Sequence, residues 1–141
     1  MITLTGKKRL LKLANHLLKG KLGHKRFDFS VFNQHYKSNN LCGSRGCALG
    51  EMPIVWPKQW RFTGDGVTCV PRGCITYVNK VKWLSLSYYD YEYLFFPDNG
   101  IKKMTSLGLK ESLPKYSTKK QVANNIIQFI KEYEKVKGKI K

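Results

Sequence analysis

Apolar residues recur at helical spacing near the start of the chain. Leu10, Leu13 and Leu17 fall on one stripe, and Gly20 follows them as a stop signal. The lysines of this segment lie mainly off that stripe. The pattern therefore predicts an amphipathic helix over residues 7–19.

A second helical pattern lies near the end of the chain. Val122, Ile126 and Phe129 share a stripe, which is a spacing typical of a helix with one buried face. Thr118, with a glutamine three residues later, forms a capping signature in front of them. We expect a basic helix over residues 119–137.

The middle of the chain carries weaker signals. Ser87 and Pro97 bracket an aromatic run and predict a helix over residues 88–96, because Ser caps helices and Pro ends them. β-branched residues at 67–70 and 74–78 flank a Pro-Arg-Gly sequence, and this arrangement predicts a β-hairpin.

The remaining segments complete the expected fold. A short helix is expected between Cys47 and Trp60, whereas residues 101–117 lack periodicity and are expected to form a loop. Together the elements predict an α+β, mostly helical fold. We expect a small single domain over residues 1–141, with three or more helices and a short β-hairpin.

Positive charge is concentrated at both ends of the sequence. The chain has 26 Lys and Arg against 9 Asp and Glu, for a formal net charge of +17. Residues 1–40 and 101–141 carry +8 each, whereas residues 41–100 carry +1. A neutral middle with all the cysteines and most of the aromatic residues thus separates two basic ends, and such ends attract polyanions.

Phosphate binding is the chemistry that this charge favours. Only five of the 26 basic residues are Arg, and Lys lacks the bidentate fork that reads bases. We therefore expect non-specific electrostatic binding to nucleic acid, with a merely solvated basic surface or an acidic protein partner as the alternatives. The candidate residues for this contact are Lys7, Lys8, Arg9, Lys12, Lys19, Lys21, Lys25, Arg26, Lys119, Lys120, Lys131 and Lys135.

Four cysteines form two matching boxes with the pattern C-x-x-R-G-C. Two short loops with two thiolates each can hold one tetrahedral zinc ion, although the usual spacing has two residues between the cysteines rather than four. Disulfides and packed free thiols are the alternatives. The candidate zinc ligands are Cys42, Cys47, Cys69 and Cys74.

No catalytic motif is visible in the sequence. Phosphate-loop, dinucleotide-binding and nucleophile-elbow signatures are missing, and the acidic residues are too scattered for a metal-dependent nuclease. We expect a protein that is not an enzyme. No apolar run approaches the roughly 20 residues that span a bilayer, and polar residues interrupt the first leucine-rich stretch. A soluble, intracellular protein without a membrane partner is the expectation.

Several short phrases together resemble a poorly characterised family of small bacterial and phage proteins. The first cysteine box, at residues 42–50, is similar to the family's C-G-[TS]-x-x-C-A-x-G element. The C-terminal V-A-x-x-I-x-x-F pattern is similar to the family's last helix. Shorter phrases of the same family resemble residues 26–29, 84–87 and 93–97.

The resemblance implies a compact, mostly helical domain in which the first cysteine box starts a buried helix. Ala48 and Gly50 would allow close packing there. The resemblance assigns no activity, but it favours a phage or mobile-element accessory protein. The second cysteine box and the strong basicity depart from the family pattern.

The function expected from charge and resemblance together is non-enzymatic. The chain would bind nucleic acid or a nucleoprotein complex by non-specific electrostatics, in the host cytoplasm or in the virion. The alternative is a protein-interaction module, either a virion structural component or an inhibitor of a host defence protein. Its partner would then be an acidic host or viral protein.

Overall fold

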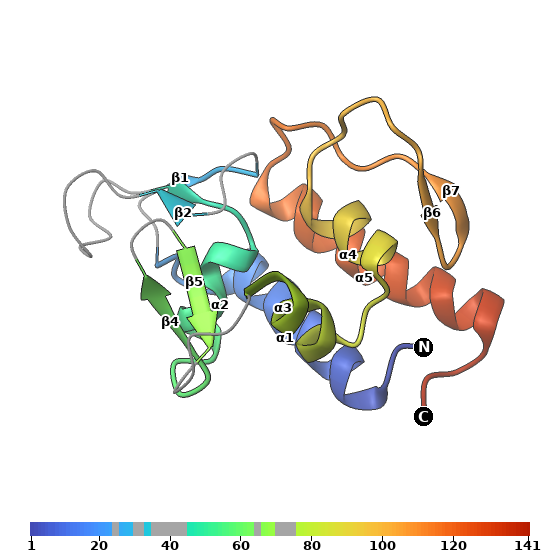
Figure 1. Cartoon of the computed structure of the whole chain (residues 1–141), viewed down its shortest axis with the longest axis horizontal. Helices are drawn as coiled ribbons and strands as arrows, with labels where there is room; N and C mark the ends of the chain where they lie inside the picture. Colours follow the sequence, from blue (N-terminus) through green and yellow to red (C-terminus); the bar gives the residue numbers. More distant parts are fainter. Residues whose placement is uncertain (24–25, 30–32, 35–44, 64–65, 70–75) are drawn as a thin grey trace.

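The computed structural model describes residues 1–23, 26–29, 33–34, 45–63, 66–69 and 76–141 (Figure 1). Helices predominate in this described part, and short strands lie between them, so the predicted mostly helical α+β class is confirmed. The helices are α1 (Leu4–Lys19), the 3₁₀ turn η1 (Leu49–Glu51), α2 (Met52–Val55), α3 (Thr76–Leu84), α4 (Tyr88–Phe95) and α5 (Lys119–Lys137). The strands are β1 (Arg26–Phe27), β2 (Asn33–Gln34), β3 (Arg45–Gly46), β4 (Trp60–Thr63), β5 (Gly66–Cys69), β6 (Lys103–Thr105) and β7 (Gly108–Lys110).

The three helices with the clearest sequence patterns are present, and a side-chain cap begins each of them. Thr3 Oγ1 accepts from the Gly6 amide, and α1 therefore begins at Leu4, three residues before the predicted start. Ser87 caps α4 in the same way. Thr118 and Gln121 cap α5 reciprocally, which gives this helix its predicted bounds.

Helices α1 and α5 pack against each other and run in opposite directions. Lys7 near the start of α1 bonds Glu134 near the end of α5, at 2.6 Å between Nζ and Oε1. The Ile2 amide donates to the Tyr133 hydroxyl at 3.2 Å. The two ends of the chain therefore lie side by side in Figure 1. Helices α1 and α5, which are remote in sequence, therefore form a packed antiparallel pair.

Helices α3 and α4 cover the same side of this pair. Helix α3 packs on α1, and α4 packs on α5 and on strand β6 (Figure 1). Gly6 permits the close approach of α1 to the end of α3, because a Cβ at this position would lie 2.6 Å from the Leu84 carbonyl oxygen. The apolar stripes of α1 and α5 are buried between the layers, including Leu10, Leu13 and Ile126.

The predicted hairpin over residues 67–70 and 74–78 is wrong. Strand β5 pairs with the preceding strand β4 in antiparallel register, from Trp60 opposite Cys69 to Thr63 opposite Gly66. Residues 76–78 of the expected second arm instead begin α3, and the rest of that arm lies outside the described residues. The β-branched and aromatic residues of this arm favour a strand, but α3 as a whole packs on α1, and such tertiary packing outweighs the weak local preference.

The loop predicted over residues 101–117 contains a second hairpin, made by β6 and β7. Its inward positions carry polar residues, since Lys103 and Thr105 are buried whereas Met104 between them is exposed. Asp90 of α4 accepts hydrogen bonds from the amide and the hydroxyl of Ser106 at the hairpin turn. The alternation of buried apolar and exposed polar residues that predicts a strand is therefore missing here, and the sequence pattern does not predict β6 and β7.

The short helix expected between Cys47 and Trp60 is present as η1 and α2. Residues 47–50 are buried. Glu51 is buried here as well, and its carboxylate accepts from the Gly23 amide at 2.7 Å and lies 2.9 Å from His16 Nε2. These bonds tie η1 to the end of α1. No helix in the described ranges has the length and apolar character needed to cross a membrane.

Candidate nucleic-acid interface

Three lysines of α1 form one exposed stripe. Lys8, Lys12 and Lys19 are all exposed, and their spacings of four and seven residues place them on the same side of the helix. At 1.5 Å for each residue the stripe extends about 16 Å. The helix contains no Asp or Glu, so its outer surface is uniformly cationic or neutral.

The outer side of α5 repeats this arrangement. Lys120, Lys131 and Lys135 are exposed and span about 22 Å, with exposed Asn and Gln side chains between them. The helix has two acidic residues. Glu134 is bonded to Lys7, and Glu132 accepts from Gln128 at 3.2 Å.

The fold places the two stripes on helices that pack against each other. Helices α3 and α4 lie on one side of the α1–α5 pair (Figure 1), and both lysine stripes belong to the exposed surface of this pair. Packed helix axes are separated by about 8–10 Å, a distance that lysine side chains can bridge. We call this surface the basic face; it consists of Lys8, Lys12, Lys19, Lys120, Lys131 and Lys135.

Three of the predicted phosphate-binding residues make contacts within the protein. Lys12, on the basic face, has its Nζ 5.8 Å from the centre of the Trp56 ring, and the other two are not part of the basic face. Lys7 is held by Glu134. The Arg9 guanidinium carbon lies 3.3 Å from the centre of the Trp83 ring, and Nη1 donates to the Trp83 carbonyl at 2.8 Å. Burial lowers the pKa of Arg9. These two side chains join α1 to α5 and to α3, respectively.

The other predicted basic residues lie around one end of the helix pair. Lys21 and Arg26 are exposed just after α1, and Lys119 is half-buried in the first turn of α5. Because α1 and α5 are antiparallel, the end of α1 and the start of α5 occupy the same end of the pair. Lys25 lies outside the described residues.

The cysteine boxes are only partly within the described residues. Cys47 is buried, with 3% of its surface exposed, and this burial raises the pKa of its thiol. Cys42, Cys74 and the side chain of Cys69 lie outside the described part. Within that part, no three His, Cys, Asp or Glu side chains are grouped as a metal site would need. The zinc site remains a prediction that metal analysis of the purified protein can test.

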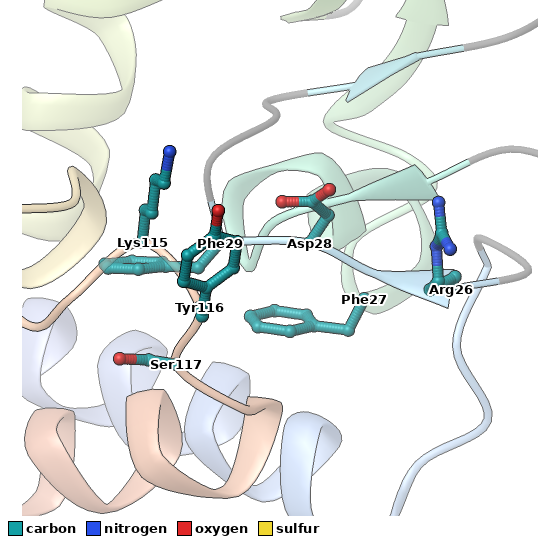
Figure 2. Close-up of a pocket in the computed structure, with 7 residues that line it drawn as sticks. All are labelled: Arg26, Phe27, Asp28, Phe29, Lys115, Tyr116 and Ser117. Carbon is teal, nitrogen blue, oxygen red and sulfur yellow. The ribbon is translucent and has the colours of Figure 1, made fainter.

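A pocket that the sequence did not indicate lies beside this end of the helix pair. It has a volume of about 410 Å³ and lies between β1 and the turn that precedes α5 (Figure 2). Its lining residues are Arg26, Phe27, Asp28, Phe29, Lys115, Tyr116 and Ser117. They come from two segments almost 90 positions apart, so no local motif marks them. The local signals were the family-like phrase at residues 26–29 and an aromatic residue, Tyr116, in a polar segment.

The aromatic run of α4 serves the core on one side. Tyr91 and Phe95 are buried, and their rings lie 5.4 Å apart, whereas Tyr88 and Tyr89 are exposed. This division agrees with core packing on one side of an amphipathic aromatic helix.

Comparison of the chain with family models, with curated proteins and with solved structures finds no match.

Proposed function

We propose that this chain is a small phage or mobile-element accessory protein that binds nucleic acid through the basic face, without catalysing a reaction. The observation that supports this proposal is the antiparallel packing of α1 on α5. It joins two lysine stripes that are more than 100 positions apart in the sequence. Six lysines over about 20 Å correspond to about one cation for each phosphate of a single strand, or one for every two phosphates of a duplex.

The composition of the basic face favours contact with phosphates rather than with bases. All six of its cations are lysines, which act as point charges and lack the planar fork of Arg. Phosphate contacts position a protein on nucleic acid but carry no sequence information. Binding is therefore expected to be tolerant of sequence and steeply dependent on salt.

A salt titration of duplex binding tests this proposal. If about four to six lysines each neutralise one phosphate, the logarithm of the binding constant falls with the logarithm of salt with a slope of about −4 to −5. Raising salt from 50 to 200 mM then weakens binding by about 300- to 1,000-fold. Fluorescence anisotropy with two unrelated duplex sequences of equal length measures both the slope and the sequence tolerance. Absence of binding at low salt would contradict the proposal.

A second candidate function is the protein-interaction module, and the β6–β7 hairpin favours it. Met104 and Leu109 are cross-strand partners and are 61% and 57% exposed, respectively. Ile101, just before the hairpin, is also exposed. An apolar pair on the outside of a two-stranded hairpin is a typical protein contact. A stoichiometric complex that survives nuclease treatment and is lost in the Met104→Ser, Leu109→Ser variant would support this alternative.

A further inference from the structure

The pocket between β1 and the turn before α5 has features that phosphate binding alone does not use. Three of its lining side chains are aromatic, and two are cationic. Phe29 is buried and Phe27 is half-buried, whereas Tyr116 is 86% exposed. In Figure 2, Phe27 and Tyr116 project into the same space from opposite walls. The pocket therefore offers apolar ring faces to a ligand that enters from solvent.

Tyr116 is held in position although its side chain is exposed. The Ser117 amide and hydroxyl both donate to the Pro114 carbonyl, at 3.0 and 2.7 Å. The next residue, Thr118, begins the capping box of α5. The turn is thus fixed on both sides of the ring, so a flat ligand can stack on Tyr116 at little cost in backbone ordering.

The charges of the pocket fit a base better than a phosphate. Lys115 Nζ lies 5.0 Å from the centre of the Tyr116 ring, and Arg26 lines the same pocket. Asp28 also lines it, so the charged lining is mixed rather than purely cationic. Aromatic rings beside cations are the usual surroundings of an unpaired base whose backbone remains outside.

The position of the pocket connects it to the basic face. Helix α1 ends at Lys19 and α5 begins at Lys119, and both ends run beneath the pocket in Figure 2. Lys19 and Lys120 of the basic face lie at this end of the pair, so a strand bound along the basic face would pass near the pocket here. Bases in an intact duplex are stacked inside it and cannot enter, whereas those of a single strand can.

We propose that this pocket binds an unpaired base of a single-stranded nucleic acid whose backbone lies along the basic face. The inference rests on the proposed function, and it adds a preference for single strands over duplexes. Stacking on one aromatic side chain changes affinity by about 5- to 150-fold when that side chain is removed.

Binding of a mixed-sequence single-stranded DNA and of a duplex of equal phosphate number, measured by anisotropy, tests the proposal with a Tyr116→Ala variant. We expect Tyr116→Ala to weaken single-strand binding about 10-fold and to leave duplex binding and both salt slopes unchanged, because no charge is lost. Tyr116→Phe keeps the ring and is expected to bind as the wild type does. Tyr89→Ala removes another exposed tyrosine, on α4, and serves as the matched control.

The outcomes separate this inference from the function on which it rests. Equal binding of Tyr116→Ala and wild type to the single strand overturns the base pocket, while salt-dependent duplex binding still supports the basic face. An equal loss on single strand and duplex also overturns it, since a general contact would then explain the effect. If neither nucleic acid binds at low salt, both proposals fail.

Discussion

Helices α4 and α5 begin alike and bury similar residues, yet their outer sides differ completely. Each starts with a hydroxyl cap, and each buries aliphatic and aromatic side chains against the other. The Tyr93 and Phe129 rings, one from each helix, lie 5.9 Å apart. The outer side of α4 carries exposed tyrosines and no lysine, whereas the outer side of α5 carries lysine, asparagine and glutamine.

The difference between the outer sides of α4 and α5 shows that the fold depends on the buried side of each helix and not on the residues outside. The inner sides supply the burial that stabilises both helices, and neither needs the charge outside. Six lysines on one surface repel one another, and such repulsion opposes folding. The lysines of the basic face therefore do not contribute to the stability of the fold, and this supports the proposal that they have a binding role.

The largest expected effect lies on the shared inner side. Leu94→Ala in α4 and Ile126→Ala in α5 each remove a fully buried aliphatic side chain, and each is expected to lower the free energy of unfolding by about 2–5 kcal/mol. Urea unfolding followed by circular dichroism measures both. Gln128→Ala, on the exposed side of α5, should change stability by less than about 0.5 kcal/mol. A large loss in that control would mean that the outer side also supports the fold.

The helix caps should contribute smaller and nearly equal amounts. Ser87→Ala and Thr118→Ala each leave the amide three residues later without its side-chain partner, at a cost of about 1 kcal/mol. Thr118→Ser keeps the hydroxyl and is expected to retain most of the stability. Thermal unfolding of the three variants measures these losses of stability. Unequal losses at the two caps would show that the caps of α4 and α5 are not equivalent.

The smallest expected effect concerns the ion pair between α1 and α5. Hydrogen bonds from Lys7 and then from the Ile140 amide lower the pKa of Glu134 below its ordinary value of 4.5. Because the folded state then holds this proton less tightly than the unfolded chain, the contribution is present above the ordinary range and is lost as pH falls through the folded-state pKa. Glu134→Gln is therefore expected to be slightly less stable than wild type at neutral pH.

That difference should shrink as the pH is lowered from about 5 toward about 2. Urea midpoints of both proteins across this range provide the measurement. In a Lys7→Gln background, Glu134→Gln should have a smaller effect, since the principal partner is already gone. A difference that is constant with pH would show that this ion pair makes no measurable contribution.

The sequence was sufficient for elements whose buried side is apolar. It placed α5 at its observed bounds and α1 and α4 within three residues, because apolar periodicity and hydroxyl caps coincide there. It missed β6 because that strand buries Lys103 and Thr105. It assigned strand to the start of α3 because local preference there opposes the tertiary packing.

The sequence predicted only part of the candidate interface. Charge partition indicated two basic ends, but nothing local says that α1 packs on α5 or that Lys7 and Arg9 are engaged within the protein. The pocket is less visible still, since Phe27 and Tyr116 become neighbours only in the folded chain. Sites assembled from remote segments require the topology before their residues can be grouped.

The most direct test of the basic face compares two variants with the same net charge. Each replaces four lysines by glutamine and takes the formal net charge from +17 to +13. The first variant changes the basic face at Lys8, Lys19, Lys120 and Lys131. The second changes lysines outside the basic face, at Lys58, Lys82, Lys102 and Lys110.

We expect the first variant to bind duplex DNA at least about 100-fold more weakly at low salt, with a salt slope that falls by about 3 to 4. We also expect it to unfold at a temperature no lower than that of wild type, because like-charge repulsion is relieved. The second variant should keep nearly the whole slope. Equal losses of affinity in the two variants would contradict the account, since net charge alone would then explain the binding.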